Sequence, residues 1–227
     1  MATTQSDLDY PFPRPDDVLT APEVAPGLHW LRFDTVGGSL GHVNVYALAG
    51  PEGWTIVDTG LGNDATRVLW GEFLAGPLSG NPIARILCTH GHYDHVGQAA
   101  WLQEMSSAPL LMTQAEWELA ANPGQRLTPP SGDMGEFYRR VGLDDEALAG
   151  LMAGTPLRRP APLADAGGRV TIADGDVLAI AGRPWQVIVG GGHSPEHACL
   201  YDAANRVLIA GDQILPAISP NISVYAR

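Results

Sequence analysis

Residues 89–97, with the sequence Thr-His-Gly-His-Tyr-Asp-His-Val-Gly, contain three histidines and one aspartate within six positions. An apolar run at residues 83–88 precedes them and predicts a buried strand. The histidine-rich segment is therefore expected to be a loop at the carboxyl end of a strand, where open α/β sheets tend to place their chemistry. Neutral imidazole and carboxylate groups suit Zn²⁺ and similar divalent ions. This density of ligand types predicts a metal site rather than a polar surface loop.

The composition is that of one large globular domain or two small ones. The chain has 227 residues, of which 45% are hydrophobic and 17% are charged, and it is long enough to bury a substantial core. It carries 25 acidic and 13 basic residues, all of the latter arginine, for a formal net charge of -12. Such a surface should repel a phosphate backbone, so nucleic acid is not an expected partner. Cys88 and Cys199 lie in apolar runs and are expected to be buried free thiols.

The N-terminal region bears on where the protein is expected to act. Residues 1–26 hold five of the 19 prolines and show no periodicity, which predicts an extended or disordered arm. They lack the basic start and apolar core of a signal peptide. No run in the chain approaches the roughly 20 apolar residues that a membrane span needs. The expected localisation is the cytoplasm.

The remaining residues, 27–227, are expected to form one mixed domain. In its first part, apolar or alternating runs predict strands at residues 28–33, 42–48, 54–57, 83–88 and 109–112. Three helical patterns lie between or after them, at about residues 64–74, 98–105 and 114–121. Asn63 or Asp64 is the expected cap of the first helix. Thr113 is the expected cap of the third, with Glu116 as its capping-box partner.

Residues 122–168 differ in composition and are expected to be an insert. They are rich in proline and glycine, and helical patterns at 136–141 and 144–152 predict a helical hairpin. From residue 169 onward the chain is expected to be rich in strands, at residues 170–172, 177–180, 185–189, 198–201 and 206–210.

Two more candidate ligands follow strands in this second half. His193 comes after residues 185–189 through three glycines, and Asp212 comes after residues 206–210 through Gly211. Glycines before a ligand allow the backbone to approach a site closely. Candidate ligands in both halves of the chain therefore lie at strand ends.

Four landmarks, in order along the chain, resemble the metallo-β-lactamase superfamily over roughly residues 28–215. They are a strand followed by Asp58-Thr59-Gly60, the His-x-His-x-Asp-His pattern at residues 90–95, the Gly192-His193 loop, and Gly211-Asp212 after a strand. The resemblance implies an α/β fold of four layers, an αββα sandwich with a metal site at one edge between two sheets. It is closest to the branch that includes the hydroxyacylglutathione hydrolases (glyoxalase II).

The resemblance also implies roles for individual residues. One metal ion would be held by His90, His92 and His193, and a second by Asp94, His95 and Asp212, with Asp212 bridging the two. Asp58 would orient a ligand histidine without binding metal, the alternative being a residue that only forms a strand-end turn. Two zinc ions are expected, with iron or manganese as alternatives.

One departure from the family concerns the end of the sequence. Family members usually continue with another strand, a helix and a last histidine that completes the second metal site, whereas this sequence stops at Arg227, about fifteen residues past Asp212. The resemblance therefore predicts a truncated chain or a second site that is short of one ligand. It also predicts an uncovered sheet edge at residues 207–210 and an exposed Ile214-Leu215 pair, with association into a homodimer left open.

The expected reaction is hydrolysis by a metal-bound hydroxide. Three histidines on one ion leave an open coordination position, and water bound there has a pKa of roughly 7. Asp94 is the expected catalytic residue, which orients the hydroxide and passes a proton to the leaving group. Four residues are expected to contact the substrate if the insert covers the site, namely Tyr93, Tyr138, Arg139 and Arg140, with a solvated helix face as the alternative for the two arginines. His42 is expected to line the pocket, and His197 to support a ligand or contact the substrate, with a structural or surface role as the alternative for both.

The expected substrate is a thioester or ester of a small metabolite. A lactone, as in acyl-homoserine lactonases, and a phosphodiester, as in nucleases, are alternatives that use the same chemistry. A β-lactam is a further alternative but ranks low, because β-lactamases usually act outside the cytoplasm and the sequence shows no export signal. A function of another class also stays open, in which the chain is an inactive or truncated metal-binding protein.

Overall fold

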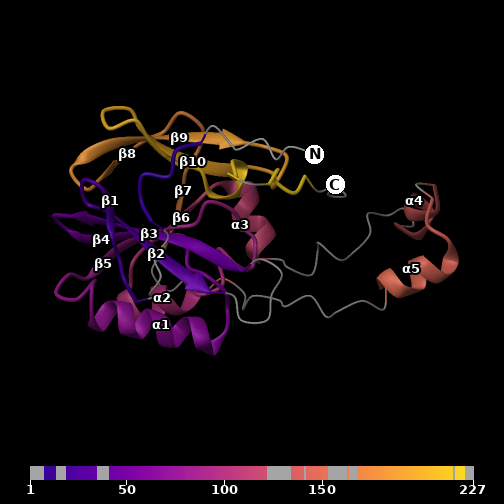
Figure 1. The fold of residues 1–227 in the computed structure, drawn as a ribbon, viewed down its shortest axis with the longest axis horizontal. Coiled ribbons are helices and arrows are strands. Elements are labelled where there is room, and N and C mark those ends of the chain that lie inside the picture. Colours follow the sequence, from indigo (N-terminus) through magenta and orange to yellow (C-terminus); the bar gives the residue numbers. More distant parts are fainter. Residues whose placement is uncertain are drawn as a thin grey trace.

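The fold is built on two β-sheets that face each other (Figure 1). A computed structural model describes residues 8–13, 19–34, 41–121, 134–140, 142–152, 163, 168–216 and 218–222. The larger sheet has seven strands in the order β1 (Glu23–Ala25), β2 (Leu28–Asp34), β3 (His42–Gly50), β4 (Gly53–Val57), β5 (Ile83–Leu87), β6 (Leu110–Met112) and β7 (Arg169–Thr171). The smaller sheet has the order β11 (Val207–Ile209), β10 (His197–Asp202), β9 (Arg183–Gly190) and β8 (Val177–Ile180).

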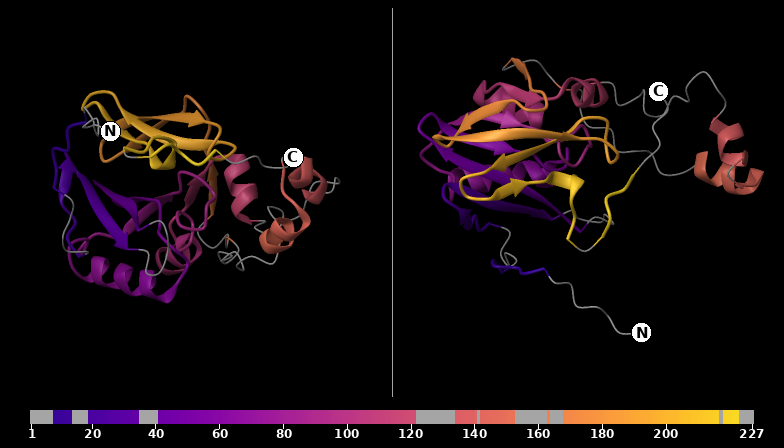
Figure 2. Two further views of the ribbon diagram at one scale, coloured as in Figure 1. Left: turned by 45° about the vertical axis from the view of Figure 1, so that its right-hand side comes forward. Right: turned by 90° about the horizontal axis from the view of Figure 1, so that it is seen from above.

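Helices lie on the far side of the larger sheet from the smaller one (Figures 1 and 2). They are α1 (Asp64–Ala75) and α2 (Ala99–Ser106), and α3 (Gln114–Ala121) follows β6. Among the described residues, no helix covers the outer face of the smaller sheet. The predicted α/β sandwich is confirmed, with helices seen on one of its two outer faces. No described helix is long and apolar enough to cross a membrane.

Two apolar cores hold the layers together. In the first, Phe33 of the larger sheet packs against Trp70 and Phe73 of α1, with ring centroids 5.1 and 5.3 Å apart. The second lies between the sheets and joins residues such as Val57 to Trp185. The five residues of β4 are all buried because this strand has neighbours on both edges and packing on both faces.

The strand directions bring several strand ends to one edge of the sandwich. β4, β5, β6 and β7 pair in parallel, so their carboxyl ends meet at the same edge of the larger sheet. β3 is antiparallel to β4, and its first residue, His42, therefore lies toward that edge too. The loop that follows β5 carries residues 89–97, as the sequence predicts.

Most of the predicted elements are present with small shifts in their bounds. Glu23–Ala25 lies in the region that the sequence predicts to be an extended or disordered arm, but it forms β1 and pairs with β2. β11 is an edge strand, where Leu208 is 40% exposed, and Ile214 beyond it is 61% exposed, as expected of this region. Cys88 and Cys199 are buried free thiols.

The predicted helical hairpin is also present. Its helices are α4 (Met134–Arg140) and α5 (Asp145–Met152), which lie beside each other and are joined by an ion pair between Arg139 and Asp145. Figures 1 and 2 show both helices well apart from the two sheets. The expectation that this insert lies over the metal site is therefore wrong for its two helices.

Candidate metal centre

Three histidines from the two sheets converge at the edge where β5 ends. The Nε2 atom of His90 lies 2.8 Å from Nδ1 of His92 and 3.2 Å from Nε2 of His193. His90 and His92 follow β5 in the larger sheet, and His193 lies between β9 and β10 in the smaller one. These three nitrogens form one of two groups in the described residues that could hold a metal ion.

Hydrogen bonds to the other ring nitrogens fix which nitrogen carries the proton. Nδ1 of His193 lies 2.9 Å from the carbonyl oxygen of Asn221, which can only accept, so Nδ1 carries the proton. Nδ1 of His90 lies 3.0 Å from Thr89 Oγ1, whose own proton points to the Asp58 carboxylate 2.9 Å away. Nδ1 of His90 is therefore the donor as well. In the neutral form of each ring, Nε2 is then unprotonated, and the two lone pairs face each other.

The second group consists of His90, His95 and Asp212. One oxygen of Asp212 lies 3.5 Å from Nε2 of His95, and the other lies 3.5 Å from Nε2 of His193. A single carboxylate thus faces both groups, which suits a bridging ligand. An oxygen of Asp94 lies 3.7 Å from Nε2 of His95 on the same side.

The electrostatics of the cluster leave His90 and Asp212 in their ligand forms at neutral pH, whereas His95 favours its protonated form and must lose a proton to bind metal. Burial, together with the surrounding histidines, holds the pKa of His90 well below its usual range, so this ring is neutral and can act as a ligand. Burial raises the pKa of Asp212, but hydrogen bonding to His95 and the nearby imidazoles outweigh it and lower the pKa to about 2. Burial would also lower the pKa of His95, but the carboxylates of Asp58, Asp212 and Asp94 raise it well above its usual range.

Asp58 lies behind the ligand cluster. Its carboxylate accepts hydrogen bonds from the N–H of Thr89 at 2.8 Å and from its hydroxyl, and lies 2.8 Å from Nδ1 of His95. It therefore orients His95 directly and His90 through Thr89, which is the contact the resemblance implies. Its backbone φ of 64° lies in the left-handed region, where a short polar side chain is tolerated.

These residues fit a divalent ion such as zinc. Tetrahedral zinc with Zn–N distances of 2.0–2.1 Å places its nitrogen ligands about 3.3 Å apart, close to the spacing found here. Facing lone pairs repel each other unless a cation lies between them, and carboxylate or carbonyl acceptors behind ligand histidines are the usual support of a metal site.

Comparison with known proteins agrees with this geometry. Residues 38–227 match the model of the metallo-beta-lactamase superfamily. The chain belongs to this superfamily. A solved structure, a beta-lactamase domain protein from Burkholderia ambifaria, is 35% identical and has a TM-score of 0.75, covering 96% of this chain and 64% of that chain.

Two curated relatives carry names that mention an activity. The linear primary-alkylsulfatase of a Pseudomonas species is 32% identical over 187 residues, which are 76% of this chain and 33% of that protein. The Bacillus subtilis protein named "Probable metallo-hydrolase YflN" is 25% identical over 196 residues, 85% of this chain and 66% of that protein. The chain therefore spans between about one third and about two thirds of the length of these superfamily relatives.

Only some of the residues predicted to contact substrate lie near the candidate metal centre. Tyr93 and His42 are half-buried near the site edge. Tyr138, Arg139 and Arg140 lie on α4, and the structure does not bring them to the histidines. Their assignment as substrate contacts rested on an insert that covers the site, which the two helices do not do.

Of the two roles expected for His197, the structure shows support of a candidate ligand and not contact with substrate. His197 is fully buried, so it does not line an accessible surface. Its Nε2 accepts a hydrogen bond from the N–H of Asp212 at 3.1 Å, and its ring stacks on that of His90. A Cβ atom on Gly211 would lie 2.7 Å from this ring, so the chain needs glycine there, where φ is +50°. His197 thus supports the backbone of a candidate ligand.

The sequence prediction for Glu116 is wrong. Its carboxylate does not close a capping box with Thr113 but accepts hydrogen bonds from the N–H groups of Gly91 and Glu196, which lie in the two ligand-bearing loops. The Thr113 hydroxyl donates to the Glu196 carbonyl instead. A buried glutamate in a short helix is a weak signal, since its partners are 25 and 80 residues away in sequence.

Proposed function

We propose that this metal-dependent hydrolase uses zinc to cleave a thioester or ester bond of a small metabolite. The observation that carries the proposal is the position of Asp212, whose two oxygens face His95 and His193 and so connect two ligand groups at one sheet edge. Zinc ions held there would supply a Lewis acid and lower the pKa of a bound water molecule.

The residues at this edge would have two tasks, which are metal binding and proton transfer. His90, His92 and His193 would hold one ion, and Asp94, His95 and Asp212 the other. Asp94 is 6% exposed and lies beside His95, so its carboxylate can take a proton from the attacking water. The water oxygen forms a bond to the acyl carbon while the bond to the thiolate or alkoxide breaks. Asp94 then returns the proton to that leaving group.

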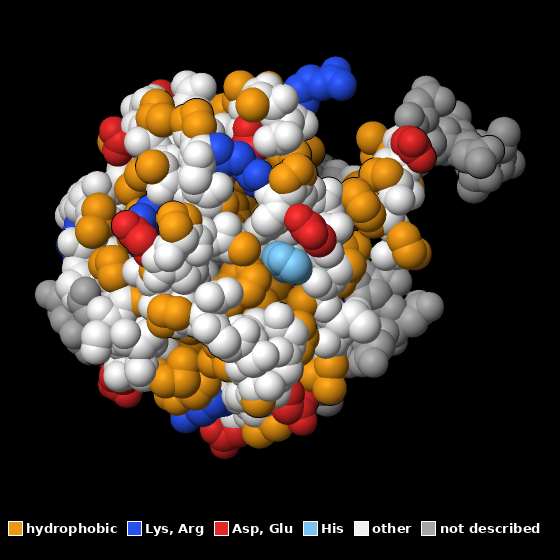
Figure 3. Space-filling model, turned by 90° about the vertical axis from the view of Figure 1, so that its left-hand side faces the viewer, with side chains coloured by type: hydrophobic (Ala, Val, Ile, Leu, Met, Phe, Trp, Pro, Cys, Tyr) orange, Lys and Arg blue, Asp and Glu red, His pale blue; other side chains and the backbone are white. Residues whose placement is uncertain are grey.

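A sulfate ester is a second candidate substrate. The specific observation in its favour is the 32% identity to a linear primary-alkylsulfatase over 76% of this chain. Phosphodiesters receive less support, because the net charge is -12. On the face shown in Figure 3, arginine side chains lie scattered among acidic and hydrophobic ones. A phosphate backbone would find no continuous basic surface on that face.

A substrate panel tests the proposal. The zinc-loaded chain is assayed against acyl thioesters, aryl and alkyl esters, acyl-homoserine lactones, β-lactams, alkyl sulfates and bis-p-nitrophenyl phosphate. Hydrolysis of a thioester or ester at the highest kcat/KM is expected. Cleavage of alkyl sulfates alone would favour the second candidate. Zinc binding without any hydrolysis would instead favour a non-hydrolytic metal-binding protein.

Two variants connect the measured activity to the site. Asp94→Ala is expected to lower kcat by about 10²- to 10⁴-fold, the usual range for a lost acid–base group. His92→Ala removes a ligand that the first ion needs and is expected to lower activity at least as much. Circular dichroism checks that both variants remain folded. Unchanged activity in both variants contradicts the assignment of this site.

A further inference from the structure

The start of α3 joins the two loops that carry the first group of histidines. Glu116 is fully buried there, in the first turn of the helix. One of its carboxylate oxygens accepts a hydrogen bond from the N–H of Gly91 at 2.7 Å, and the other accepts from the N–H of Glu196 at 2.8 Å. A single side chain thus holds two backbone groups that lie in loops connected to different sheets of the sandwich.

The contact with Glu196 is reciprocal. The Glu196 carboxylate accepts a hydrogen bond from the N–H of Ala115 at 2.9 Å, and its carbonyl oxygen accepts one from the Thr113 hydroxyl at 2.9 Å. Four hydrogen bonds in all therefore fix the first turn of α3 against the two loops. Bonds to carboxylates are charge-assisted and stronger than bonds between neutral groups.

The bonded residues lie beside the candidate ligands. Gly91 separates His90 from His92, and Glu196 follows His193 by three residues. The helix also approaches closely, because a Cβ atom at Gly91 would lie 2.7 Å from the Glu116 carbonyl oxygen. A shift of α3 would therefore change the positions of the His90 and His92 backbones relative to His193.

We propose that the start of α3, through the bonds of Glu116 and Thr113 to the two loops, is a positioning element that sets the affinity of this site for its divalent ion. A buried carboxylate is costly unless it is hydrogen-bonded, and here both of its oxygens are bonded to loop backbone. Holding the two loops in place before the ion arrives removes an ordering cost from binding. The inference rests on the metal site of the proposed function, but not on hydrolysis.

The test is the zinc affinity of the full chain and its Glu116→Gln variant, measured by competition with a chromophoric chelator. Glutamine has the same shape, but its amide oxygen can accept only one of the two N–H groups, while its NH₂ opposes the other. A loss of affinity of about 10- to 100-fold is expected, the usual effect of removing support behind metal ligands. Wild-type affinity in this variant would overturn the inference.

Asp202→Asn is the matched control. Asp202 is also a fully buried carboxylate that accepts hydrogen bonds from two backbone N–H groups, those of Ala204 and Asn205. It lies at the other end of β10 from the site. The control is expected to lower thermal stability but leave zinc affinity unchanged. An equal loss of affinity in the control would show a general effect of destabilisation and would also overturn the inference.

Thr113→Val provides a second route if Glu116→Gln fails to fold. Valine has nearly the same shape as threonine and removes only the bond to the Glu196 carbonyl. A folded variant with zinc affinity reduced by several-fold supports the inference, and unchanged affinity overturns it. If the wild-type chain itself binds no zinc, the proposed function fails; if wild type and variants bind equally, only the positioning role fails.

Discussion

The two ends of β10 bury polar side chains in opposite ways. At its far end, Asp202 accepts hydrogen bonds from the backbone of Ala204 and Asn205 and from the Asn205 amide, and it pairs with Arg183 at 2.8 Å. Two backbone N–H groups and one amide donate to the carboxylate, and the guanidinium of Arg183 adds a positive charge beside it. The Asp202 carboxylate is therefore satisfied by groups of the chain, and it closes the turn between β10 and β11.

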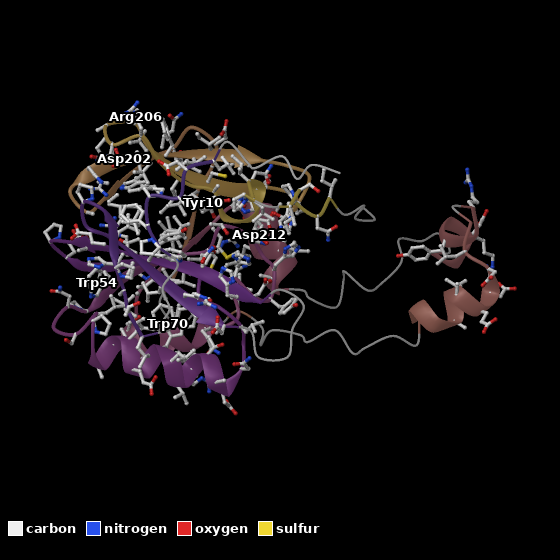
Figure 4. The ribbon with its side chains drawn as sticks, viewed as in Figure 1. Tyr10, Trp54, Trp70, Asp202, Arg206 and Asp212 are labelled. Atoms are coloured by element: carbon white, nitrogen blue, oxygen red, sulfur yellow. The ribbon has the colours of Figure 1, made fainter. Side chains whose placement is uncertain are left out.

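At the near end of β10, two ring nitrogens face each other and leave no donor between them in the neutral forms of the rings. His197 begins the strand and stacks on His90, whose unprotonated Nε2 faces that of His193 at 3.2 Å. Asp212 brings a carboxylate to the same place (Figure 4). Buried acceptors that converge in this way need a shared cation. The comparison shows that satisfaction of polar groups, rather than their burial, distinguishes the metal site from a structural turn.

The largest expected difference between the two ends of β10 is in how far each contributes to the stabilisation that zinc provides. With free zinc at about 1,000 times its Kd, the free energy of unfolding is expected to rise by about 4 kcal/mol over the metal-free chain. The rise should be the same in Asp202→Asn, because the ends of β10 lie roughly 17 Å apart at about 3.4 Å per residue, and distant sites act independently. His92→Ala should lose most of it.

Urea unfolding, followed by tryptophan fluorescence with zinc or with a chelator, measures these differences. If Asp202→Asn abolishes the stabilisation by zinc, the two ends of β10 are coupled, which contradicts the expectation that they act independently. A stabilisation that persists in His92→Ala would place the ion elsewhere.

The strands and the ligands could be predicted from the sequence because both depend on local patterns. Residues 89–97 place four ligand groups after one apolar run, and His193 and Asp212 each follow a strand through glycine. Because β9 and β11 belong to the other sheet, these local patterns did not by themselves join His193 and Asp212 to the first cluster; the resemblance to the superfamily, which implies one site between two sheets, did.

The supporting contacts could not be predicted, because they are backbone hydrogen bonds between distant segments. Glu116 has the spacing of a capping box with Thr113, yet its partners come from other loops. The position of His197 after His193 allowed either a supporting role or a substrate contact, and only its burial against the N–H of Asp212 decides between them. Helical periodicity predicts α4 and α5 but not where the pair lies relative to the sheets, so it could not show whether the insert covers the site.

A smaller difference between the ends should appear with pH. Burial is the main cause that lowers the pKa of His197 to about 4. Between pH 6.5 and 4 the unfolded chain takes up a proton at this residue while the folded chain does not, so stability falls as the pH falls. The metal-free chain should lose up to about 3 kcal/mol from this residue over that range.

His197→Gln isolates the effect, since its amide oxygen can still accept from the N–H of Asp212 but does not titrate. Urea unfolding of the metal-free wild type and variant at several pH values gives the two slopes. The stability gap between them should narrow or reverse toward pH 4. Parallel curves would show that His197 titrates alike in the folded and unfolded chain.

The smallest expected effect is at Asp58, one layer behind the ligands. Asp58→Asn keeps a residue that tolerates the φ of 64°, so the fold should be retained. An amide can still accept from the N–H of Thr89, but it removes the charge that orients His95. Zinc affinity should fall by about 10- to 100-fold, or about 1.4–2.7 kcal/mol.

In Asp202→Asn, the same chemical change at the far end of β10 should leave the zinc affinity unchanged. Chelator competition on both variants decides whether a buried carboxylate matters to the ion by its position or merely by its contribution to stability.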